Sequence, residues 1–372
     1  MPILSIIVPV YNVAPYLRAC LDSVCVAVGE IEKVGGEKRW TKEGRFLAEV
    51  ICVDDGSTDG SGEILDEYVE RVNSSSCEFE REGGVGEENG KTSAVHLHLF
   101  SPPSFRVIHQ ENGGVSAARN AALDVATGEW VMMLDGDDAW APDLLVRLFE
   151  KIDENPTCEA VGFGMVKVDE KGNDLGTFGS ESVSAVTTGD GVLLDGRGPM
   201  SHFIWSSCDK VYRRSAIERM HLRYRVGMRL SEDSFFAHKF MAQAGVVVLA
   251  PEIKGYRYLM REGSAIHTQD TKLPEMPFAV FIELLELWKR IRTPGLKVRL
   301  QLMAADMPSL GKAENFAAGV RTEAVEYLLR SNEFNSVIIP FLLLHGSPKG
   351  RIFALIYMLS PRILKRKILA RL

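Results

Sequence analysis

Residues 130–138 read Trp-Val-Met-Met-Leu-Asp-Gly-Asp-Asp, an apolar run that ends in three carboxylates. The apolar part has the composition of a buried strand, so Asp135, Asp137 and Asp138 are expected where that strand ends. Carboxylates this close together repel one another unless a cation or a ligand lies between them. Oxygen ligands of this kind suit Mg²⁺ or Mn²⁺ held jointly with substrate phosphates. The alternative is an acidic turn in which Asp135 or Asp138 caps the next helix.

Composition narrows the class of protein. The chain has 372 residues, of which 46% are hydrophobic and 25% charged, as in ordinary globular proteins. Its six cysteines form no Cys-x-x-Cys pair and the first residues contain no basic leader, so neither a zinc site nor a secreted disulfide framework is expected. No apolar stretch approaches the ~20 residues that cross a bilayer. We therefore expect a cytoplasmic protein with reduced thiols.

Strand and helix patterns alternate along the first half of the chain. β-Branched apolar runs predict buried strands, and amphipathic segments between them predict helices. The expected strands are residues 3–10, 49–53, 105–109 and 129–134, followed by a strand-like run at 160–168. The expected helices are residues 12–28, 60–72, 115–126 and 142–155. This order predicts an α/β fold with a mostly parallel sheet flanked by helices.

The remaining segments suggest a domain division. Residues 30–45 and 73–103 are charged or rich in Gly and Ser, which favours surface insertions. After Pro274 the pattern is helical almost to the end. We expect a catalytic domain over residues 1–270, a helical extension over 271–346 and a basic amphipathic helix over 347–372.

The last segment differs in charge from the rest of the chain. The net charge is −7, yet residues 347–372 contain seven basic residues and no acidic one. The body should therefore repel nucleic acid. Apolar residues recur among these cations at near-helical spacing, which is typical of a helix on the inner face of an anionic membrane. The alternative is a C-terminal helix that packs on its own domain.

A second acidic group, residues 53–60 (Val-Asp-Asp-Gly-Ser-Thr-Asp-Gly), also follows a strand. Ligands of open α/β sheets collect at that edge. The spacing from Asp55 to Asp66 approaches an EF-hand loop, but the segment before it is β-branched and the closing residue is Asp instead of Glu. The nucleotide interpretation has Asp54 or Asp55 bind a base or ribose, while Ser57 or Asp59 caps the next helix.

Two common phosphate-binding motifs are missing from the sequence. Residues 11–15 after the first strand lack Gly-x-Gly-x-x-Gly, and no Gly-Lys-Ser/Thr loop occurs. A divalent cation can hold phosphates instead. Residues 110–120 support this hypothesis, because a Gly-Gly turn opens a small-residue helix that carries Arg119 beside the sheet edge. The functional interpretation has Arg119 contact the pyrimidine or pair with the neighbouring carboxylates. The alternative is a solvated arginine on the surface of the helix.

Four motifs together resemble family 2 glycosyltransferases, which have the GT-A fold. They are Pro-Val-Tyr-Asn at 9–12, Val-Asp-Asp-Gly-Ser-Thr-Asp at 53–59, Gly-Gly-Val-Ser-Ala-Ala-Arg-Asn at 113–120 and Leu-Asp-Gly-Asp-Asp at 134–138. The resemblance covers about residues 1–270. It implies an inverting transfer of a sugar from a nucleotide diphosphate, usually UDP, to a hydroxyl acceptor.

The resemblance also implies roles for individual residues. Tyr11 would stack on the base and Asp55 would bind it, within a nucleotide site that includes Pro9, Asn12, Asp54, Arg119 and Asp135. Asp137 of the Asp-x-Asp motif would ligate Mn²⁺ or Mg²⁺, with Asp138 and His267 as further candidate ligands.

On the acceptor side, Ser231-Glu232-Asp233 resembles the Glu-Asp pair that precedes a helix in this family, which makes Asp233 the candidate general base. Inversion needs a carboxylate beside the acceptor hydroxyl. The alternative is helix capping by Ser231 with two acidic residues in the first turn. The segment around Trp205 and Lys210 looks like the acceptor-side segment of the family, so Trp205, Lys210 and Glu232 are candidate contacts of the acceptor. The alternative for Trp205 is a position in the core. The acceptor would be a saccharide or a lipid-linked saccharide used in polysaccharide assembly. Two other functions stay open, a catalytically silent nucleotide-sugar-binding protein and a nucleotidyltransferase.

Overall fold

The computed structural model describes residues 2–35, 47–74, 78–81, 95–98, 103–178, 183–228, 231–261 and 276–306, with 340, 343 and 344. The chain divides into two compact units. The first is Met1–Thr188, His202–Phe240 and Ala244–Arg261, and the second is Gly189–Ser201, Met241–Gln243 and Glu262–Leu372. The expected boundary at residue 270, the expected ligand His267 and the basic segment 347–372 lie outside the described residues, so they stay predictions.

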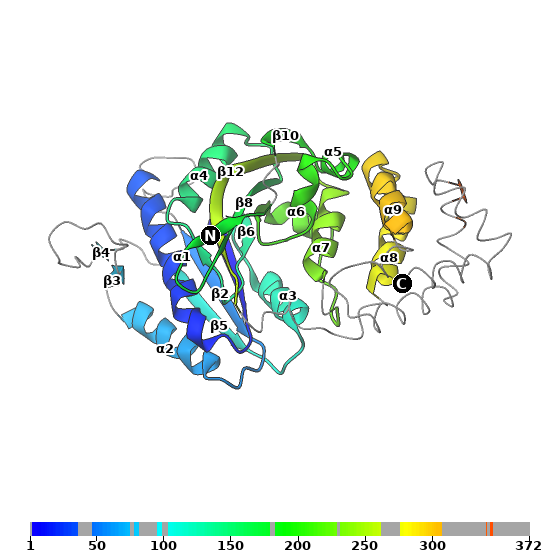
Figure 1. Ribbon diagram of the computed structural model, residues 1–372. Coiled ribbons are helices and arrows are strands. Elements are labelled where there is room, and N and C mark those ends of the chain that lie inside the picture. Colours follow the sequence, from blue (N-terminus) through cyan, green and yellow to red (C-terminus); the bar gives the residue numbers. More distant parts are fainter. Residues whose placement is uncertain are drawn as a thin grey trace. The chain divides into compact units, whose positions relative to one another are not determined.

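A ten-stranded sheet forms the centre of the first unit (Figure 1). The principal order of its strands is β10-β12-β8-β11-β6-β1-β2-β5, while β7 pairs with β12 and β9 pairs with β8. The strands are β1 (Leu4–Val10), β2 (Ala48–Asp54), β5 (Ser104–His109), β6 (Trp130–Met133), β7 (Ala139–Trp140), β8 (Ala160–Val168), β9 (Asp174–Thr177), β10 (Ala185–Thr188), β11 (Lys210–Arg213) and β12 (Val246–Leu259).

The strands of the N-terminal part run parallel, as expected. β1 pairs in parallel with both β2 and β6, and β2 pairs in parallel with β5. Every residue of β1 and β2 is buried, so both faces of these strands are covered. β11 runs antiparallel to both of its neighbours, which makes the later part of the sheet mixed. The α/β prediction with a central parallel sheet is confirmed.

The register brings three chain segments to one edge of the sheet. Val10 lies opposite Asp54, and the Asp55 N–H donates to the Val10 carbonyl at 2.9 Å. On the other side of β1, the Leu134 N–H donates to the Ile7 carbonyl, also at 2.9 Å. The segments that follow β1, β2 and β6 therefore leave the sheet side by side. Pro9, which cannot donate a backbone hydrogen bond, lies beyond the last residue of β1 that pairs with β6.

Helices of the first unit contact one another and the sheet. α1 contacts α2 and α4, while α3 packs on β1 and β2. Their bounds are α1 (Ala14–Gly35), α2 (Ser61–Ser74), α3 (Val115–Val125), α4 (Leu144–Glu154), α6 (Arg214–Arg219) and α7 (Glu232–Met241).

The first helix runs further than expected, into the segment 30–45 that composition marks as an insertion. Residues 30–35 continue α1, because buried Val24, Val28 and Ile31 extend the apolar stripe of the helix by one more turn. Within the expected insertion at 73–103, α2 continues to Ser74. The same insertion contains a two-stranded antiparallel hairpin of β3 (Glu78–Arg81) and β4 (Val95–His98), which the composition did not suggest.

The described part of the second unit is helical, as the pattern after Pro274 predicts. It contains α5 (Gly189–Leu194), α8 (Met276–Ile291) and α9 (Pro294–Asp306), and α9 contacts both of the others. Gly295 at the start of α9 donates its N–H to Asp190 at 2.8 Å, and a Cβ there would lie 2.2 Å from the Asp190 carbonyl oxygen. Glycine is therefore required for this close approach.

The described residues also bear on two expectations from composition. Their five cysteines are all buried free thiols. No helix among them combines the length and the apolar character that a membrane-spanning segment needs.

Candidate active site

The carboxylate of Asp55 is held by three N–H donors. Its Oδ1 accepts hydrogen bonds from the Gln110 side chain at 2.7 Å and the Gly113 N–H at 2.8 Å, and its Oδ2 accepts from the Gly114 N–H at 2.8 Å. The residue is only 2% exposed. A Cβ on Gly113 would lie 2.9 Å from the Ala117 side chain, so the Gly-Gly turn lets the backbone approach the carboxylate. The two motifs are thus parts of one structure.

Residues 54–60, here called the donor loop, are also tied to the end of β1. Asn12 has a φ of 52°, and its side-chain oxygen accepts a hydrogen bond from the Thr58 N–H at 2.8 Å. The Asn12 N–H in turn donates to Ser57 Oγ at 3.1 Å. Tyr11, by contrast, is 50% exposed. This leaves its ring accessible at the same edge of the sheet as Asp55.

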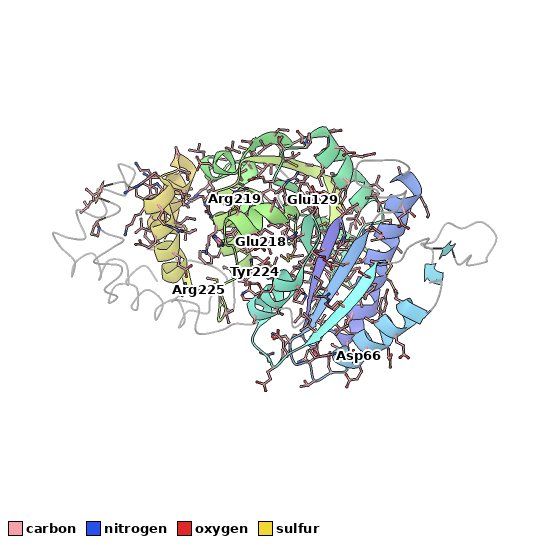
Figure 2. The ribbon with its side chains drawn as sticks, turned by 180° about the vertical axis from the view of Figure 1, so that it is seen from behind. Asp66, Glu129, Glu218, Arg219, Tyr224 and Arg225 are labelled. Carbon is pink, nitrogen blue, oxygen red and sulfur yellow. The ribbon has the colours of Figure 1, made fainter. Side chains whose placement is uncertain are left out.

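Asp54 fixes the start of the donor loop. It accepts a hydrogen bond from the Ser57 N–H at 3.0 Å, and its other oxygen lies 3.0 Å from His109 Nδ1. Burial opposes ionisation of Asp54, but the bonds from Ser57 and His109 outweigh it and lower its pKa. The hydrogen bond to Asp54 also raises the pKa of His109, whose Nε2 lies 3.2 Å from Asp66 on α2 (Figure 2). The structure therefore places Asp54 in the support of the loop.

Arg119 connects carboxylates from two distant parts of the chain. Its side chain is 2% exposed, and Nη2 donates to Asp135 at 2.7 Å. Nη1 donates to Asp233 at 2.6 Å and to Glu232 at 3.1 Å. Of the roles considered for Arg119, the structure thus displays the pairing with carboxylates. We refer to Asp135, Asp137, Asp138, Glu232 and Asp233 as the acidic cluster.

Glu232 and Asp233 both hold their protons more tightly than ordinary carboxyl groups. Burial and the neighbouring Asp233 raise the pKa of Glu232 to about 7, although Arg119 opposes the shift. Burial likewise raises the pKa of Asp233, again against Arg119. Asp233 also accepts a hydrogen bond from Ser207 Oγ at 2.7 Å. A carboxylate with a raised pKa is a stronger base than a free one, as general base catalysis requires.

The remaining two members of the acidic cluster have different surroundings. Asp138 is 3% exposed and accepts hydrogen bonds from the Tyr256 hydroxyl at 2.7 Å and the Leu259 N–H at 2.8 Å. These bonds anchor β12, so Asp138 has a structural task whether or not it binds metal. Asp137 is paired with Arg261, whose Nε and Nη2 lie 2.8 and 2.7 Å from one carboxylate oxygen. The Arg261 guanidinium also lies over the Tyr16 ring, 5.1 Å from its centroid.

The donor set of this region fits a divalent cation shared with a ligand. Burial and the charge of Asp135 raise the pKa of Asp137 despite Arg261, and burial with both neighbours raises that of Asp138. The cluster thus carries more negative charge than its arginines neutralise. Among the described residues, no three His, Cys, Asp or Glu side chains are arranged to hold a metal ion. A metal held mainly by substrate phosphates needs only one or two protein carboxylates, for which Asp137 is the candidate.

The two candidate acceptor contacts have different environments. Trp205 is 57% exposed, and its ring meets His238 of α7 edge to face, with 6.2 Å between centroids. Lys210 is fully buried, donates to the Ser206 carbonyl at 2.7 Å and pairs with Asp209. Burial raises the pKa of Asp209 to about 6, although Lys210 opposes the shift. The expectation that Lys210 contacts the acceptor is therefore not supported, because its side chain is enclosed in the protein interior.

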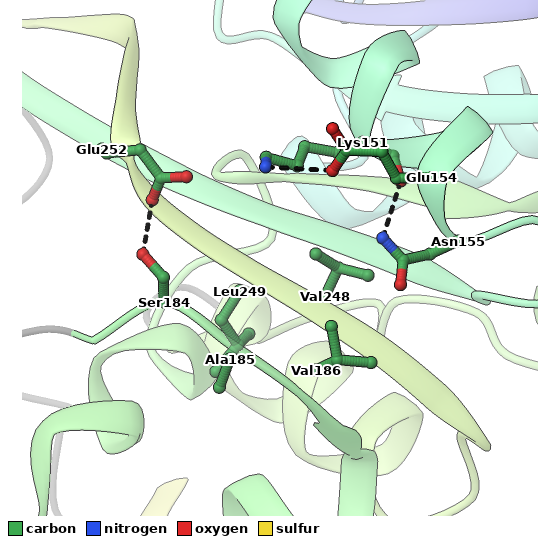
Figure 3. A pocket seen from close by; sticks show the side chains of 9 residues that line it. All are labelled: Lys151, Glu154, Asn155, Ser184, Ala185, Val186, Val248, Leu249 and Glu252. Atoms are coloured by element: carbon green, nitrogen blue, oxygen red, sulfur yellow. Dashed lines mark hydrogen bonds and ion pairs between the residues drawn. The ribbon is translucent and has the colours of Figure 1, made fainter.

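A hollow of about 270 Å³ lies elsewhere in the first unit (Figure 3). It is formed by the end of α4, by β10 and by β12. None of the candidate site residues lines it. Its walls combine apolar side chains such as Val186 and Val248 with the charged Lys151, Glu154 and Glu252. The hollow is therefore a separate feature from the acidic cluster.

Several residues of the site were not predicted from the sequence. Ser207, Tyr224, Tyr256 and Arg261 contact the acidic cluster or Arg119 only because of chain folding. No local pattern marks them. Gln110 is different, since it directly precedes the Gly-Gly turn at the end of a strand, and that position could have suggested its contact with Asp55.

The comparison with protein families decides the classification. The model of glycosyl transferase family 2 matches residues 5–220, more than half of the chain. The chain belongs to this family. The matched part contains the four motifs and Arg119, but ends before Glu232 and Asp233.

Individual relatives agree with this classification. The uncharacterized glycosyltransferase EpsJ of Bacillus subtilis is 29% identical over 279 residues, which are 74% of this chain and 66% of EpsJ. Glycosyltransferase GlyA of Streptococcus pneumoniae is also 29% identical, over 70% of this chain and 31% of GlyA. The chain thus spans less than two thirds of the length of these relatives.

Solved structures establish the fold. TarS 1–349 of S. aureus superposes with a TM-score of 0.59 at 20% identity, over 95% of this chain and 89% of that one. Its complex with UDP-GlcNAc gives a TM-score of 0.55. At this identity the likeness concerns the fold alone, which is the GT-A fold that the motifs predicted.

Proposed function

We propose that this chain is an inverting glycosyltransferase that moves a sugar from a nucleotide diphosphate, in the first place UDP, to a hydroxyl of a saccharide or lipid-linked saccharide in polysaccharide or glycan biosynthesis. The observation that supports the proposal most is the arrangement around one sheet edge. The donor loop with Asp55 follows β2, and Asp137 follows β6, the two strands that flank β1, while Arg119 joins this edge to Glu232 and Asp233.

The donor loop suits the nucleotide. Asp55 is fixed by three N–H donors, and exposed Tyr11 offers a flat aromatic face on which a base can stack. The UDP-GlcNAc complex of TarS makes a uridine nucleotide the first donor to examine. In this proposal Asn12 and Asp54 shape the loop, and Asp135 faces the ribose or the metal.

The acidic cluster suits the leaving diphosphate. A bound Mg²⁺ or Mn²⁺ would supply positive charge that stabilises the departing nucleoside diphosphate. Asp137 would hold that ion, with Asp138 and His267 as further candidates. Arg261 would then exchange its partner Asp137 for another anion.

Asp233 is the proposed general base. It accepts the proton of the acceptor hydroxyl while the hydroxyl oxygen forms a bond to the anomeric carbon and the bond from that carbon to the diphosphate breaks. Trp205 would offer its exposed face to the acceptor sugar, because it lies beside the helix that begins with Glu232 and Asp233. Glu232 shares Arg119 with the base and completes this side of the site.

Titration calorimetry with UDP, with and without Mn²⁺, tests the proposal. We expect binding that depends on Mn²⁺, followed by release of UDP from a UDP-sugar. Release of pyrophosphate would instead indicate a nucleotidyltransferase, and binding without any turnover a silent nucleotide-sugar-binding protein. Failure to bind UDP in both conditions would contradict the uridine assignment.

We also propose, from the sequence alone, that residues 347–372 attach the protein to an anionic membrane surface. Their seven cations and interspersed apolar residues support this. Flotation with phosphatidylglycerol vesicles should recover the full chain but not a variant that ends at residue 346. Equal recovery with neutral phosphatidylcholine vesicles would count against an electrostatic attachment.

A further inference from the structure

Arg119 lies in the middle of α3, where a buried guanidinium is costly unless anions surround it. Three carboxylates do so, and Arg119 Nη2 also lies 4.0 Å from the Cys208 thiol. Asp135 follows β6, whereas Glu232 and Asp233 open α7, about a hundred residues later. Arg119 is therefore a direct connection between the proposed donor side and acceptor side.

The geometry of the guanidinium makes this connection stiff. Its N–H groups form a planar fork of fixed directions, so the position of one bound carboxylate restricts the positions of the others. One prong, Nη2, contacts Asp135 at 2.7 Å, and the other, Nη1, contacts Asp233 at 2.6 Å. A lysine would offer a single point charge and could not maintain both directions.

Tyr224 holds the guanidinium from one face. The Arg119 guanidinium carbon lies 5.1 Å from the Tyr224 ring centroid, and the Tyr224 hydroxyl donates to Ser207 Oγ at 2.6 Å. Ser207 Oγ in turn donates to the same Asp233 oxygen that Arg119 contacts, at 2.7 Å. These contacts close a ring of Arg119, Tyr224, Ser207 and Asp233. Figure 2 shows where Tyr224 lies within the first unit.

Asn120, the neighbour of Arg119, fixes the backbone of Tyr224. Its Oδ1 accepts from the Tyr224 N–H at 2.8 Å, and its Nδ2 donates to the Tyr224 carbonyl at 2.9 Å. Two consecutive residues of α3 thus hold the same tyrosine, one by its ring and one by its backbone. This gives Arg119-Asn120 a physical task that is separate from nucleotide contact.

We propose that Arg119, held by Tyr224 and Asn120, is a positioning residue that couples the donor side of the site at Asp135 to the proposed base Asp233 and its neighbour Glu232. This inference deepens the proposed function and rests on it. A donor nucleotide that changes the surroundings of Asp135 would, through Arg119, reorder the start of α7. The base would then be aligned only when the donor is present.

Charges around Asp233 give the coupling an electrostatic part. The groups that face the Asp233–Glu232 pair are Arg119, Asp135, Asp209, Cys208, Tyr212 and Tyr224. Arg119 is the one cation among them in the described part of the chain. A shift of Arg119 therefore changes the stabilisation of both carboxylates at once.

Hydrogen–deuterium exchange tests the coupling without a known acceptor. In the parent, UDP with Mn²⁺ should slow amide exchange both in the donor loop and at residues 232–241. In Arg119→Lys, the slowing in the donor loop should persist while that at 232–241 is lost. The same variant should release UDP from a UDP-sugar about 10²-fold more slowly, since a misplacement of about 1 Å has effects of that size. Its UDP affinity and binding stoichiometry should stay within about threefold of the parent.

Two further variants keep the test decisive. Asn120→Ala removes both bonds to Tyr224 without changing charge or Arg119, and should weaken the response at 232–241 and slow UDP release about tenfold. The matched control is Arg219→Lys, because Arg219 pairs with Glu159 and is 54% exposed (Figure 2). Arg219→Lys should match the parent in its exchange response at 232–241, its rate of UDP release and its UDP affinity.

The outcomes separate this inference from the proposed function. A parent that binds no UDP refutes the donor assignment and the coupling together. A parent that binds UDP with no response at 232–241 refutes the coupling alone. An unchanged response at 232–241 in Arg119→Lys, or in Asn120→Ala if Arg119→Lys does not fold, refutes it as well.

Discussion

The donor loop and the acidic cluster lie at the same edge of the sheet, yet their charges are balanced in different ways. In the donor loop, neutral N–H groups supply the hydrogen bonds of Asp55, and the pKa of both Asp54 and Asp59 is lowered by hydrogen bonds that outweigh burial. In the acidic cluster, burial and mutual repulsion raise the pKa of Asp137, Asp138 and Glu232 even though two arginines are present.

This contrast indicates which region depends on its ligand. In the donor loop, N–H groups of the chain itself hold the carboxylates of Asp54 and Asp55, as in a preorganised binding site. The acidic cluster needs further positive charge or protons, because its carboxylates are not fully neutralised. Changes in the donor loop should therefore affect affinity, and changes in the acidic cluster should affect metal binding, pH dependence and rate.

Asp233→Asn should have the largest effect. The amide cannot accept the acceptor proton, so turnover should fall by about 10²- to 10⁴-fold while UDP affinity is kept. Initial rates of UDP release and calorimetry measure the two quantities. Asp169→Asn, in a surface turn, is the matched control. Full activity of Asp233→Asn would show that another group is the base.

Asp55→Asn should instead weaken the binding of UDP. Its amide offers only one acceptor oxygen to three N–H donors, and each hydrogen bond to a charged group contributes about 1.5–3 kcal/mol. We expect UDP affinity to fall about 10- to 100-fold in calorimetry, with a lower melting temperature. Asp174→Asn, at an exposed position, should change neither. A variant with parental affinity would remove Asp55 from the nucleotide site.

Arg261→Gln should strengthen binding of Mn²⁺ in the absence of nucleotide. Arg261 and a cation compete for Asp137, and loss of a charge-assisted pair of this kind corresponds to about a tenfold change in affinity. Electron paramagnetic resonance of free Mn²⁺ measures the affinity of each variant for the metal. Arg257→Gln is the control, because Arg257 lies on β12, shortly before Arg261 in the chain, and pairs with Asp174 at the surface. Equal Mn²⁺ affinity in both variants would mean that Asp137 does not bind the metal.

Glu232→Gln should produce the smallest change, confined to the pH dependence of activity. Burial and the charge of Asp233 raise the pKa of Glu232 to about 7, so Glu232 ionises only after Asp233 and adds a second negative charge beside it above that pH. Glu232→Gln removes this second ionisation, so any change of rate that accompanies it near pH 7 should vanish, while the rising limb of activity that follows the ionisation of Asp233 should stay where it is in the parent. Initial rates of UDP release against pH measure both. Loss of the rising limb in Glu232→Gln would contradict the assignment of Asp233 as the base.

Much of the fold followed from local patterns. The expected strand at 160–168 agrees with β8, and the expected helix at 115–126 agrees with α3 to within one residue. Short elements were missed, among them β7, whose two residues pair with β12 more than a hundred positions later. Such elements depend on a distant partner, so no local period marks them.

The sequence by itself determined which carboxylates end which strands, because an apolar strand and the polar residues after it are adjacent in the chain. That was enough to place Asp55, Asp135 and Asp137 at one edge and to identify the family. Only the tertiary structure decided the partners of those carboxylates. Arg119 pairs with Asp233 across 114 positions, and Arg261 pairs with Asp137 across 124. Lys210 carries the charge expected of a binding residue but is buried against Asp209. Long-range pairing and burial depend on how the elements pack in space, and neither quantity has a local signal in the chain.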